Sequence, residues 1–191
     1  MAGVIINNIP AKATTYVKEL IVPFMTGKGI DVVATVPSDP FMKAVRVKEL
    51  RDVLNAKILC CEEGLDYYVE RFSIGAMDVD SAMKYFRKTP NKAVITGGHW
   101  SDIQIAALET STKCLILTGD QNPSEVVVGK AMMDRVPILL VREDTLSTVE
   151  KVENLLGRIH FGGERKIERA KELLAAHLDY GLLCRKLGLS K

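Results

Sequence analysis

The sequence contains few of the residues that mark specialised classes of protein. Its four cysteines (Cys60, Cys61, Cys114 and Cys184) lack the Cys-x-x-Cys spacing of zinc or redox sites. They are also too few for a disulfide scaffold, so we expect reduced thiols buried for packing. No run of about 18 apolar residues occurs, and the start has neither the basic residues nor the apolar run of a signal peptide. We therefore expect a cytoplasmic protein that does not bind membranes.

An excess of charge is also missing. The 191 residues include 26 basic and 24 acidic side chains, which are interleaved along the chain and give a net charge of +2. Such a balance creates no long-range field that would attract nucleic acid or anionic lipid. We expect no nucleic-acid partner, and any binding function has to be inferred from local sites.

Common catalytic motifs are absent as well. Ser124 and Ser147 do not lie in a Gly-x-Ser-x-Gly elbow. The three histidines, His99, His160 and His177, are too scattered to indicate a triad or a metal site, and we expect the last two on the surface. The sequence therefore predicts no catalytic residues and no bound metal.

What the sequence does contain is an alternation of short β-branched runs and longer amphipathic stretches. This alternation is typical of βαβ crossovers on a mainly parallel sheet. The predicted strands are 4–7, 31–36, 57–61, 92–96, 114–118 and 138–141. The predicted helices are 13–26, 45–54, 79–88, 101–109, 123–134, 147–156 and 164–187. We expect a mixed α/β fold with three layers.

Helix starts in the second half carry capping signals. Ser101 with Gln104, and Asn122 followed by Pro123 and Glu125, have the pattern of capping boxes. Asp144 or Ser147 would cap the next helix. Each start follows a buried-looking strand by a few residues, so these helix ends should gather outside the carboxyl ends of the strands. A ligand is expected at that edge.

Polar residues and glycines follow the same strands. The candidate ligand-binding residues are Thr96, Gly97, Gly98, His99, Trp100, Thr118, Gly119, Asp120 and Arg142, with Asp144 nearby. Exposed backbone N–H groups at helix starts favour a small anion or a nucleotide. The alternative is that the glycines form tight turns, Asp120 bonds its own backbone and Trp100 covers the sheet edge. The sequence leaves both interpretations open.

The stretch from Lys92 to Glu153 resembles the DRTGG domain of phosphotransacetylase-family proteins and some regulated pyrophosphatases. The matching elements are Thr96-Gly97-Gly98, Ser101-Asp102-Ile103, the LILTG strand with Pro123-Ser124, Val136-Pro137 and Asp144-Thr145. The resemblance implies a three-layer α/β fold like the N-terminal domain of HPr kinase. Where that family usually has Asp-Arg after its glycines, this chain has His99-Trp100, so contacts made by that charged pair stay open.

The N-terminal segment GVIINNIP is similar to the C-terminal part of a dethiobiotin-synthetase-like P-loop domain, which precedes DRTGG in those proteins. The resemblance implies that Asn7 falls on a position that reads a nucleotide base. The phosphate loop itself is missing, because Gly27-Lys28-Gly29 has neither the earlier glycine nor the hydroxyl that holds magnesium. We expect an incomplete ATP site and no cofactor.

No periodicity is clear in residues 62–76, and we place a boundary there. The predicted domains are a truncated P-loop-like segment, 1–61, and a DRTGG domain with a C-terminal helical extension, 62–191. The main functional hypothesis is a non-catalytic regulatory, ligand-binding or oligomerisation module. The alternatives are a fragment of a dethiobiotin or cobyrinic acid amide synthase-like ligase, or a fragment of a phosphate acetyltransferase.

The predicted last helix, 164–187, suggests self-association. Its apolar residues recur at intervals of three and four and form one stripe, which comprises Ile167, Ala170, Leu174, Leu178 and Leu182. The helices before it already suffice to cover the sheet, so this stripe favours a homo-oligomer with twofold pairing. The alternative is that the stripe packs on a sheet of its own chain.

Overall fold

The computed structural model describes residues 2–157 and 163–189. The chain forms two compact units, a central unit of Lys43–His160 and a terminal unit that combines Met1–Met42 with Phe161–Lys191. This division differs from the predicted boundary at residue 61. Residues 57–60 form a strand that pairs inside the central unit, so a cut at residue 61 would remove a strand from its sheet.

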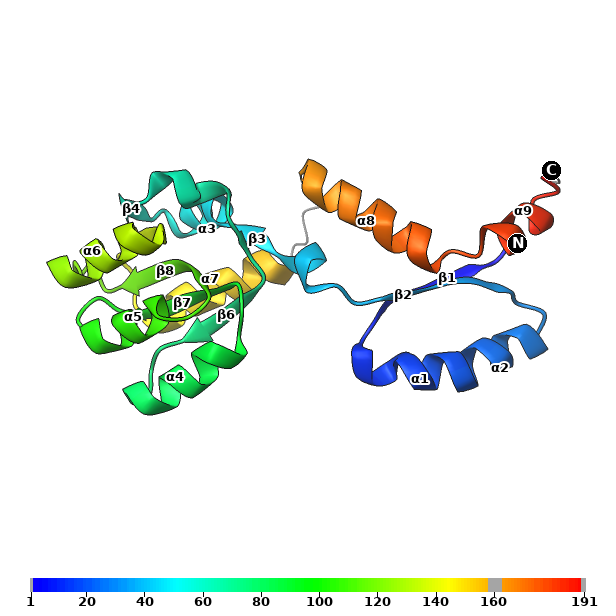
Figure 1. The fold of residues 1–191 in the computed structure, drawn as a ribbon, viewed down its shortest axis with the longest axis horizontal. Coiled ribbons are helices and arrows are strands. Elements are labelled where there is room, and N and C mark those ends of the chain that lie inside the picture. Colours follow the sequence, from blue (N-terminus) through cyan, green and yellow to red (C-terminus); the bar gives the residue numbers. More distant parts are fainter. Residues whose placement is uncertain (1, 158–162, 190–191) are drawn as a thin grey trace. The chain divides into compact units, whose positions relative to one another are not determined.

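The central unit is built on a five-stranded sheet (Figure 1) with strand order β4-β9-β8-β7-β6. The strands are β4 (Lys57–Cys60), β6 (Arg71–Ile74), β7 (Lys92–Gly97), β8 (Thr112–Thr118) and β9 (Ile138–Leu140). Only the edge strand β4 runs antiparallel to its neighbour; the pairs β6–β7, β7–β8 and β8–β9 are parallel. A short antiparallel pair, β3 (Val45–Arg46) and β5 (Tyr68–Val69), forms a separate two-stranded sheet that packs on the same core.

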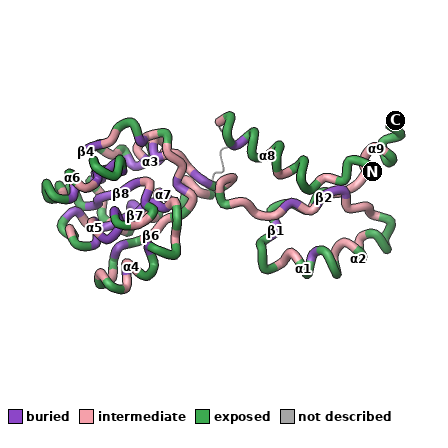
Figure 2. The backbone as a smooth tube through the Cα atoms, in the orientation of Figure 1, coloured by how far each residue is buried: buried purple, intermediate pink, exposed green. Residues whose placement is uncertain are grey.

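Helices pack on both faces of the five-stranded sheet. The helices are α3 (Val47–Leu54), α4 (Val79–Lys88), α5 (Ser101–Leu108), α6 (Glu125–Asp134) and α7 (Thr145–Gly157). Side chains alternate along β8, so Leu115 and Leu117 join one core with α4, α5 and α6, whereas Cys114 and Ile116 join a second core with α3 and α7. Figure 2 shows the central strands as buried. The predicted mixed, mainly parallel three-layer fold is confirmed.

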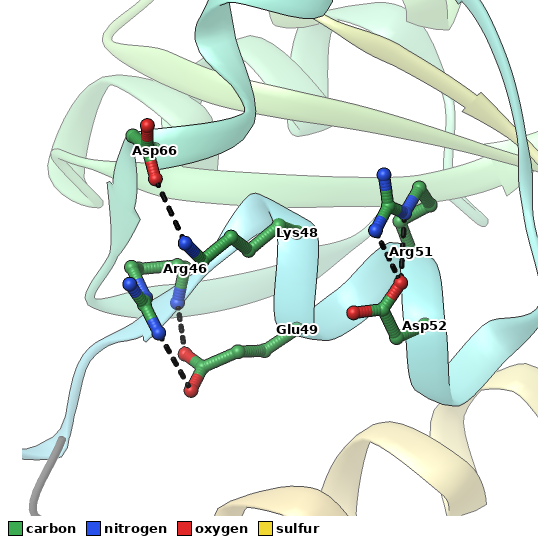
Figure 3. A network of polar contacts seen from close by, with 6 residues as sticks. All are labelled: Arg46, Lys48, Glu49, Arg51, Asp52 and Asp66. Atoms are coloured by element: carbon green, nitrogen blue, oxygen red, sulfur yellow. Dashed lines mark hydrogen bonds and ion pairs between the residues drawn. The ribbon is translucent and has the colours of Figure 1, made fainter.

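The first helix of this unit is fixed at its start by a polar network (Figure 3). The backbone N–H of Arg46 donates to Glu49 Oε2 at 2.7 Å, which satisfies a free donor at the beginning of α3. Lys48 pairs with Asp66 at 3.2 Å and so connects α3 to the 3₁₀ turn Glu62–Asp66 that comes after β4. Both side chains of that ion pair are at least one-third exposed, so it contributes little to stability.

The terminal unit contains a two-stranded parallel sheet of β1 (Val4–Ile9) and β2 (Val32–Pro37). The connecting helix comprises α1 (Thr14–Tyr16), a π turn (Val17–Ile21) and α2 (Val22–Gly27). Pro23 has no N–H to donate, and the Val22 N–H donates to the carbonyl five residues earlier, that of Val17. The backbone hydrogen bonds of the helix therefore change here from the α spacing of four residues to the π spacing of five.

The predicted single C-terminal helix is two helices, α8 (Glu164–His177) and α9 (Tyr180–Lys186). Leu178 adopts an extended conformation between them and pairs antiparallel with Ala34, while the Asp179 N–H donates to the Val33 carbonyl at 2.8 Å. The predicted stripe therefore does not extend beyond α8 as one helical face. Leu178 instead extends the sheet of the terminal unit.

Candidate ligand-binding site

A pocket of about 370 Å³ lies where four strands of the central unit end. Parallel strands bring their carboxyl ends to one edge, so the loops after β6, β7, β8 and β9 meet there. The lining residues are Gly75, Ala76, Gly97, His99, Trp100, Thr118, Gly119, Gln121, Asp144 and Thr145. This volume falls within the range of about 300–1,000 Å³ that is usual for small-molecule sites.

The turn after β7 is held tightly against the loop after β8. The Gly98 N–H donates to the Thr118 carbonyl at 3.3 Å, and a Cβ on Gly98 would meet the carbonyl oxygen of Gln121 at 1.9 Å. No side chain fits at that distance, so residue 98 must be glycine for the two loops to approach. Gly98 therefore shapes the site through packing and is not one of the lining residues.

Gln104 stabilises this turn through hydrogen bonds to its backbone. Its Nε2 donates to the carbonyl oxygens of both Gly97 and Gly98 at 2.9 Å, and the side chain is fully buried. The predicted capping box is wrong, because Trp100 occupies the N-cap position of α5 without a side-chain hydrogen bond. Gln104 Oε1 has no hydrogen-bond partner among the described residues.

His99 and Trp100 supply the aromatic surface of the pocket. Their ring centroids are 5.5 Å apart with a tilt of 50°, and Trp100 is 44% exposed. His99 Nδ1 lies 3.0 Å from Gln121 Oε1. A carbonyl oxygen only accepts, so this contact assigns a proton to Nδ1 and leaves Nε2 of a neutral imidazole as an acceptor.

Two threonine hydroxyls add polar groups. Thr118 Oγ1 lies 2.8 Å from Thr145 Oγ1, which joins the end of β8 to the start of α7. Thr118 is 4% exposed, whereas Thr145 is half-buried. Thr96 has a different role, since its buried hydroxyl donates to the Gly75 carbonyl at 2.9 Å and fixes the loop after β6.

Asp144 is the carboxylate of the pocket. Its Oδ1 accepts the Ser147 N–H at 3.0 Å and its Oδ2 accepts the Ser147 hydroxyl at 2.8 Å, so it caps α7 as one of the two predicted alternatives requires. Hydrogen bonds from the Ser147 backbone and hydroxyl lower the pKa of Asp144 below its usual value. The group is therefore ionised at neutral pH and offsets the positive end of the helix dipole.

The structure brings five of the nine candidate residues to the pocket, namely Gly97, His99, Trp100, Thr118 and Gly119. The other four do not line it. Thr96 and Gly98 support the turns, as described above. Asp120 is exposed at φ 54°, with its N–H donated to the Val141 carbonyl, and Arg142 is exposed. Asp120 thus lies in a turn, but the bond from its side chain to its own backbone, which the sequence left open as an alternative, stays a prediction.

The sequence pattern missed four lining residues, Gly75, Ala76, Gln121 and Thr145. The first two belong to the segment 62–76, whose structure could not be predicted. Gln121 could have been predicted, because it directly follows the turn residues Gly119-Asp120, which come after a strand that was predicted to end at this edge. Thr145 had one too, since it stands next to a predicted helix cap.

Asn7 lies on β1 in the terminal unit. Its side-chain oxygen accepts the N–H of Asn8 at 2.7 Å, and Asn8 has a left-handed φ of 57°. The side chain therefore stabilises a local bend at the end of the strand. Its proposed contact with a nucleotide base stays a prediction.

All four cysteines are free thiols. Burial, followed by the neighbouring Cys60, raises the pKa of Cys61 to about 12, so this thiol is not activated as a nucleophile. Among residues 2–157 and 163–189, no group of three or more His, Cys, Asp or Glu side chains is arranged to hold a metal ion. Within the same residues, no helix is both long and apolar enough to cross a membrane.

Comparison with known proteins connects this fold to one family. The family model described as the DRTGG domain matches residues 49–155, more than half of the chain. A phosphate acetyltransferase of Synechocystis sp. is 24% identical over 188 residues, which cover 94% of this chain and 27% of the relative. A phosphate acetyltransferase of Nitratidesulfovibrio vulgaris is 27% identical over 158 residues, which cover 77% and 22%. The chain thus spans about a quarter of the length of these relatives.

A solved structure shares the fold. It contains the CBS and DRTGG domains of the regulatory region of Clostridium perfringens pyrophosphatase, complexed with the activator diadenosine tetraphosphate. Its TM-score is 0.51 at 15% sequence identity, and the match covers 77% of this chain and 72% of the other. At this identity the likeness establishes the fold.

Proposed function

The chain belongs to the DRTGG domain family, and on that premise we propose that it is a non-catalytic regulatory module that binds a small-molecule ligand in the strand-end pocket. The observation that carries the proposal is the pocket itself, which combines an aromatic surface with hydroxyl, imidazole and amide groups at the carboxyl ends of the strands. All of its lining residues lie within 49–155, the part of the chain that matches the family.

The chemistry of the pocket supports binding more than catalysis. Ser147 donates to Asp144, but Asp144 is a helix cap with a lowered pKa and is therefore a weak base. The hydroxyls of Thr118 and Thr145 bond each other, and His99 Nδ1 bonds Gln121. All of the lining residues belong to the part of the chain that the structure describes, and none of them is a nucleophile paired with an activating base.

The regulated enzyme is proposed from the relatives. Two relatives that resemble most of the chain are phosphate acetyltransferases, and the similar solved structure is a regulatory region bound to an activator. We infer that the module regulates an enzyme of the phosphate acetyltransferase type, either as part of the same chain or as a separate partner. The terminal unit would correspond to the remnant of a P-loop-like domain, and fragments of a ligase or of an acetyltransferase remain the alternatives.

The test uses Trp100, which is the sole tryptophan of the chain and lines the pocket. Its fluorescence is followed while a panel of metabolites is added, including acetyl phosphate, coenzyme A and adenine nucleosides and nucleotides. Ala76 is exposed and lines the pocket, so Ala76→Phe should fill the site and weaken binding without disturbing the core. Ala175→Phe, at an exposed position on α8, is the matched control and should bind as the unmodified protein does. Binding that survives Ala76→Phe unchanged would place the ligand elsewhere and refute the proposal.

A further inference from the structure

The strand-end pocket lies near helix starts but has no cationic side chain in its lining. None of its ten lining residues is lysine or arginine, and one of them, Asp144, is an ionised carboxylate. Arg142 was the predicted cation of this site, but it does not line the pocket. Within the pocket lining, a phosphate group would thus meet a negative charge and no permanent positive one.

The helix N-termini do not compensate for this lack of cations. Asp144 already occupies the N-cap of α7. In α5, Asp102 lies in the first turn and its Oδ1 accepts the Ile103 N–H at 2.9 Å. In α6, Glu125 lies in the first turn. Each of these three helices already has a carboxylate near its N-terminus, so the dipoles that usually attract anions are offset by the protein's own charges.

The remaining groups suit a flat, uncharged partner. Trp100 is 44% exposed and offers a face on which a heterocycle stacks, and its contact with His99 keeps a second ring beside it. His99 Nε2, the hydroxyl of Thr145 and the amide of Gln121 provide hydrogen-bonding groups of both kinds. Stacking combined with hydrogen bonds to ring edges is the chemistry that recognises a nucleobase.

On the basis that this pocket binds a ligand, as proposed above, we propose that it takes the nucleobase part of a nucleoside or nucleotide, stacked on Trp100, and leaves any phosphate groups in solvent. Of the two kinds of ligand expected from the sequence, a small anion and a nucleotide, this inference keeps the nucleotide and assigns its recognition to the base. It predicts that affinity follows the base and not the number of phosphates, and that binding depends weakly on salt because no ion pair is formed.

The experiment is a titration of the full chain with adenosine, AMP, ATP and inorganic phosphate, followed by Trp100 fluorescence at low and high salt. Adenosine should bind at least as tightly as ATP, and phosphate alone should leave the fluorescence unchanged. The proposal is overturned if ATP or phosphate binds about tenfold more tightly than adenosine and loses that advantage in high salt.

A charge variant sharpens the test. Asn caps helices as well as Asp does, so Asp144→Asn keeps the start of α7 and removes the charge. Without this carboxylate a phosphate can approach the lining, so the ratio of ATP to adenosine affinity should rise, by up to about fivefold, the effect of one charge pair about 4 Å apart in water. Asp78→Asn is the matched control, because Asp78 caps α4 by accepting the Ser81 N–H and does not line the pocket. An unchanged ratio in Asp144→Asn contradicts the inference.

The two proposals fail differently. If acetyl phosphate, which has no base, binds in an Ala76-dependent manner while adenosine, AMP and ATP do not, the pocket is a ligand site but the nucleobase inference is wrong. If no compound of the metabolite panel perturbs Trp100, the ligand-binding function is itself refuted, and the nucleobase inference falls with it.

Discussion

Lys92 is fully buried at the start of β7 and should destabilise the central unit at neutral pH. Its Nζ donates to Thr110 Oγ1 at 2.7 Å and to the Ser111 carbonyl at 3.3 Å, and it lies 5.4 Å from the centre of the Phe86 ring. No carboxylate is paired with it among the described residues. Desolvation lowers the pKa of Lys92 from its ordinary value of 10.5 to about 8.

The sign of the effect follows from proton binding. Between pH 8 and pH 10.5 the unfolded chain binds this proton and the folded chain does not, so the free energy of unfolding rises with pH in that window. Below pH 8 both states are protonated, and the full cost of burying the charge is present. At about 1.4 kcal/mol for each pH unit, the lowering from 10.5 to about 8 corresponds to about 3 kcal/mol.

Replacing Lys92 with methionine keeps a long apolar side chain and removes the charge. The Thr110 hydroxyl still donates to the Ala107 carbonyl, so no new unpaired donor results. Lys92→Met should raise the free energy of unfolding by up to about 3 kcal/mol at pH 7, and the gain should vanish above pH 10.5. The measurement is urea unfolding between pH 7 and 11, followed by fluorescence of Trp100, which lies in the same unit.

Lys113→Met is the matched control, because Lys113 is only half-buried and its Nζ also lies near an aromatic ring, 5.7 Å from that of Tyr67. It should change stability by less than about 0.5 kcal/mol at every pH. A stability difference between the unmodified protein and Lys92→Met that stays constant from pH 7 to 11 would refute the reasoning. So would a loss of stability in Lys92→Met at pH 7.

Two further predictions concern packing and assembly. Gly98→Ala should destabilise the central unit by about 1–3 kcal/mol in urea unfolding, since its Cβ would meet the Gln121 carbonyl. Gly129→Ala on α6 is the control: a Cβ there has open space, so this substitution should be neutral or stabilising. Self-association stays a proposal, now confined to α8, where Ile167 is 50% and Leu174 is 39% exposed. Light scattering should detect a dimer that Leu174→Glu dissociates without changing the circular dichroism spectrum; an intact chain that is monomeric contradicts it.

The fold was predictable wherever local pattern and burial agree. All six predicted strands are present, and α4 has the predicted bounds, because Asp78 gives a clear N-cap and Ala82 and Phe86 mark the buried face. β6 was not predicted. Its residues, Arg71–Ile74, show an exposed, intermediate, intermediate, exposed pattern at the edge of the sheet, which gives neither an apolar run nor a strict alternation.

Other errors arose where tertiary contacts override local signals. Nothing in the helical spacing shows that Leu178 pairs with Ala34, some 140 positions earlier. Asp179 could have indicated the start of a new helix, since its side chain accepts the Leu182 N–H and caps α9. Likewise α6 begins at Glu125 after Ser124, and the predicted cap at Asn122 is wrong. The sequence located the edge at which the pocket lies, but not that Arg142 is outside its lining.

The terminal unit is assembled from two segments that flank the central unit in the sequence, and this arrangement constrains the order of events during synthesis. Residues 43–160 can fold as soon as they leave the ribosome, whereas β2 must wait for Leu178 and Asp179 before its second edge is paired. At about 5–20 residues per second, the delay is roughly 7–28 s. Throughout that interval, which includes the synthesis of the central unit, the buried β2 residues Val33 and Val36 have no complete unit in which to pack, so the nascent chain presents a strand edge to other proteins.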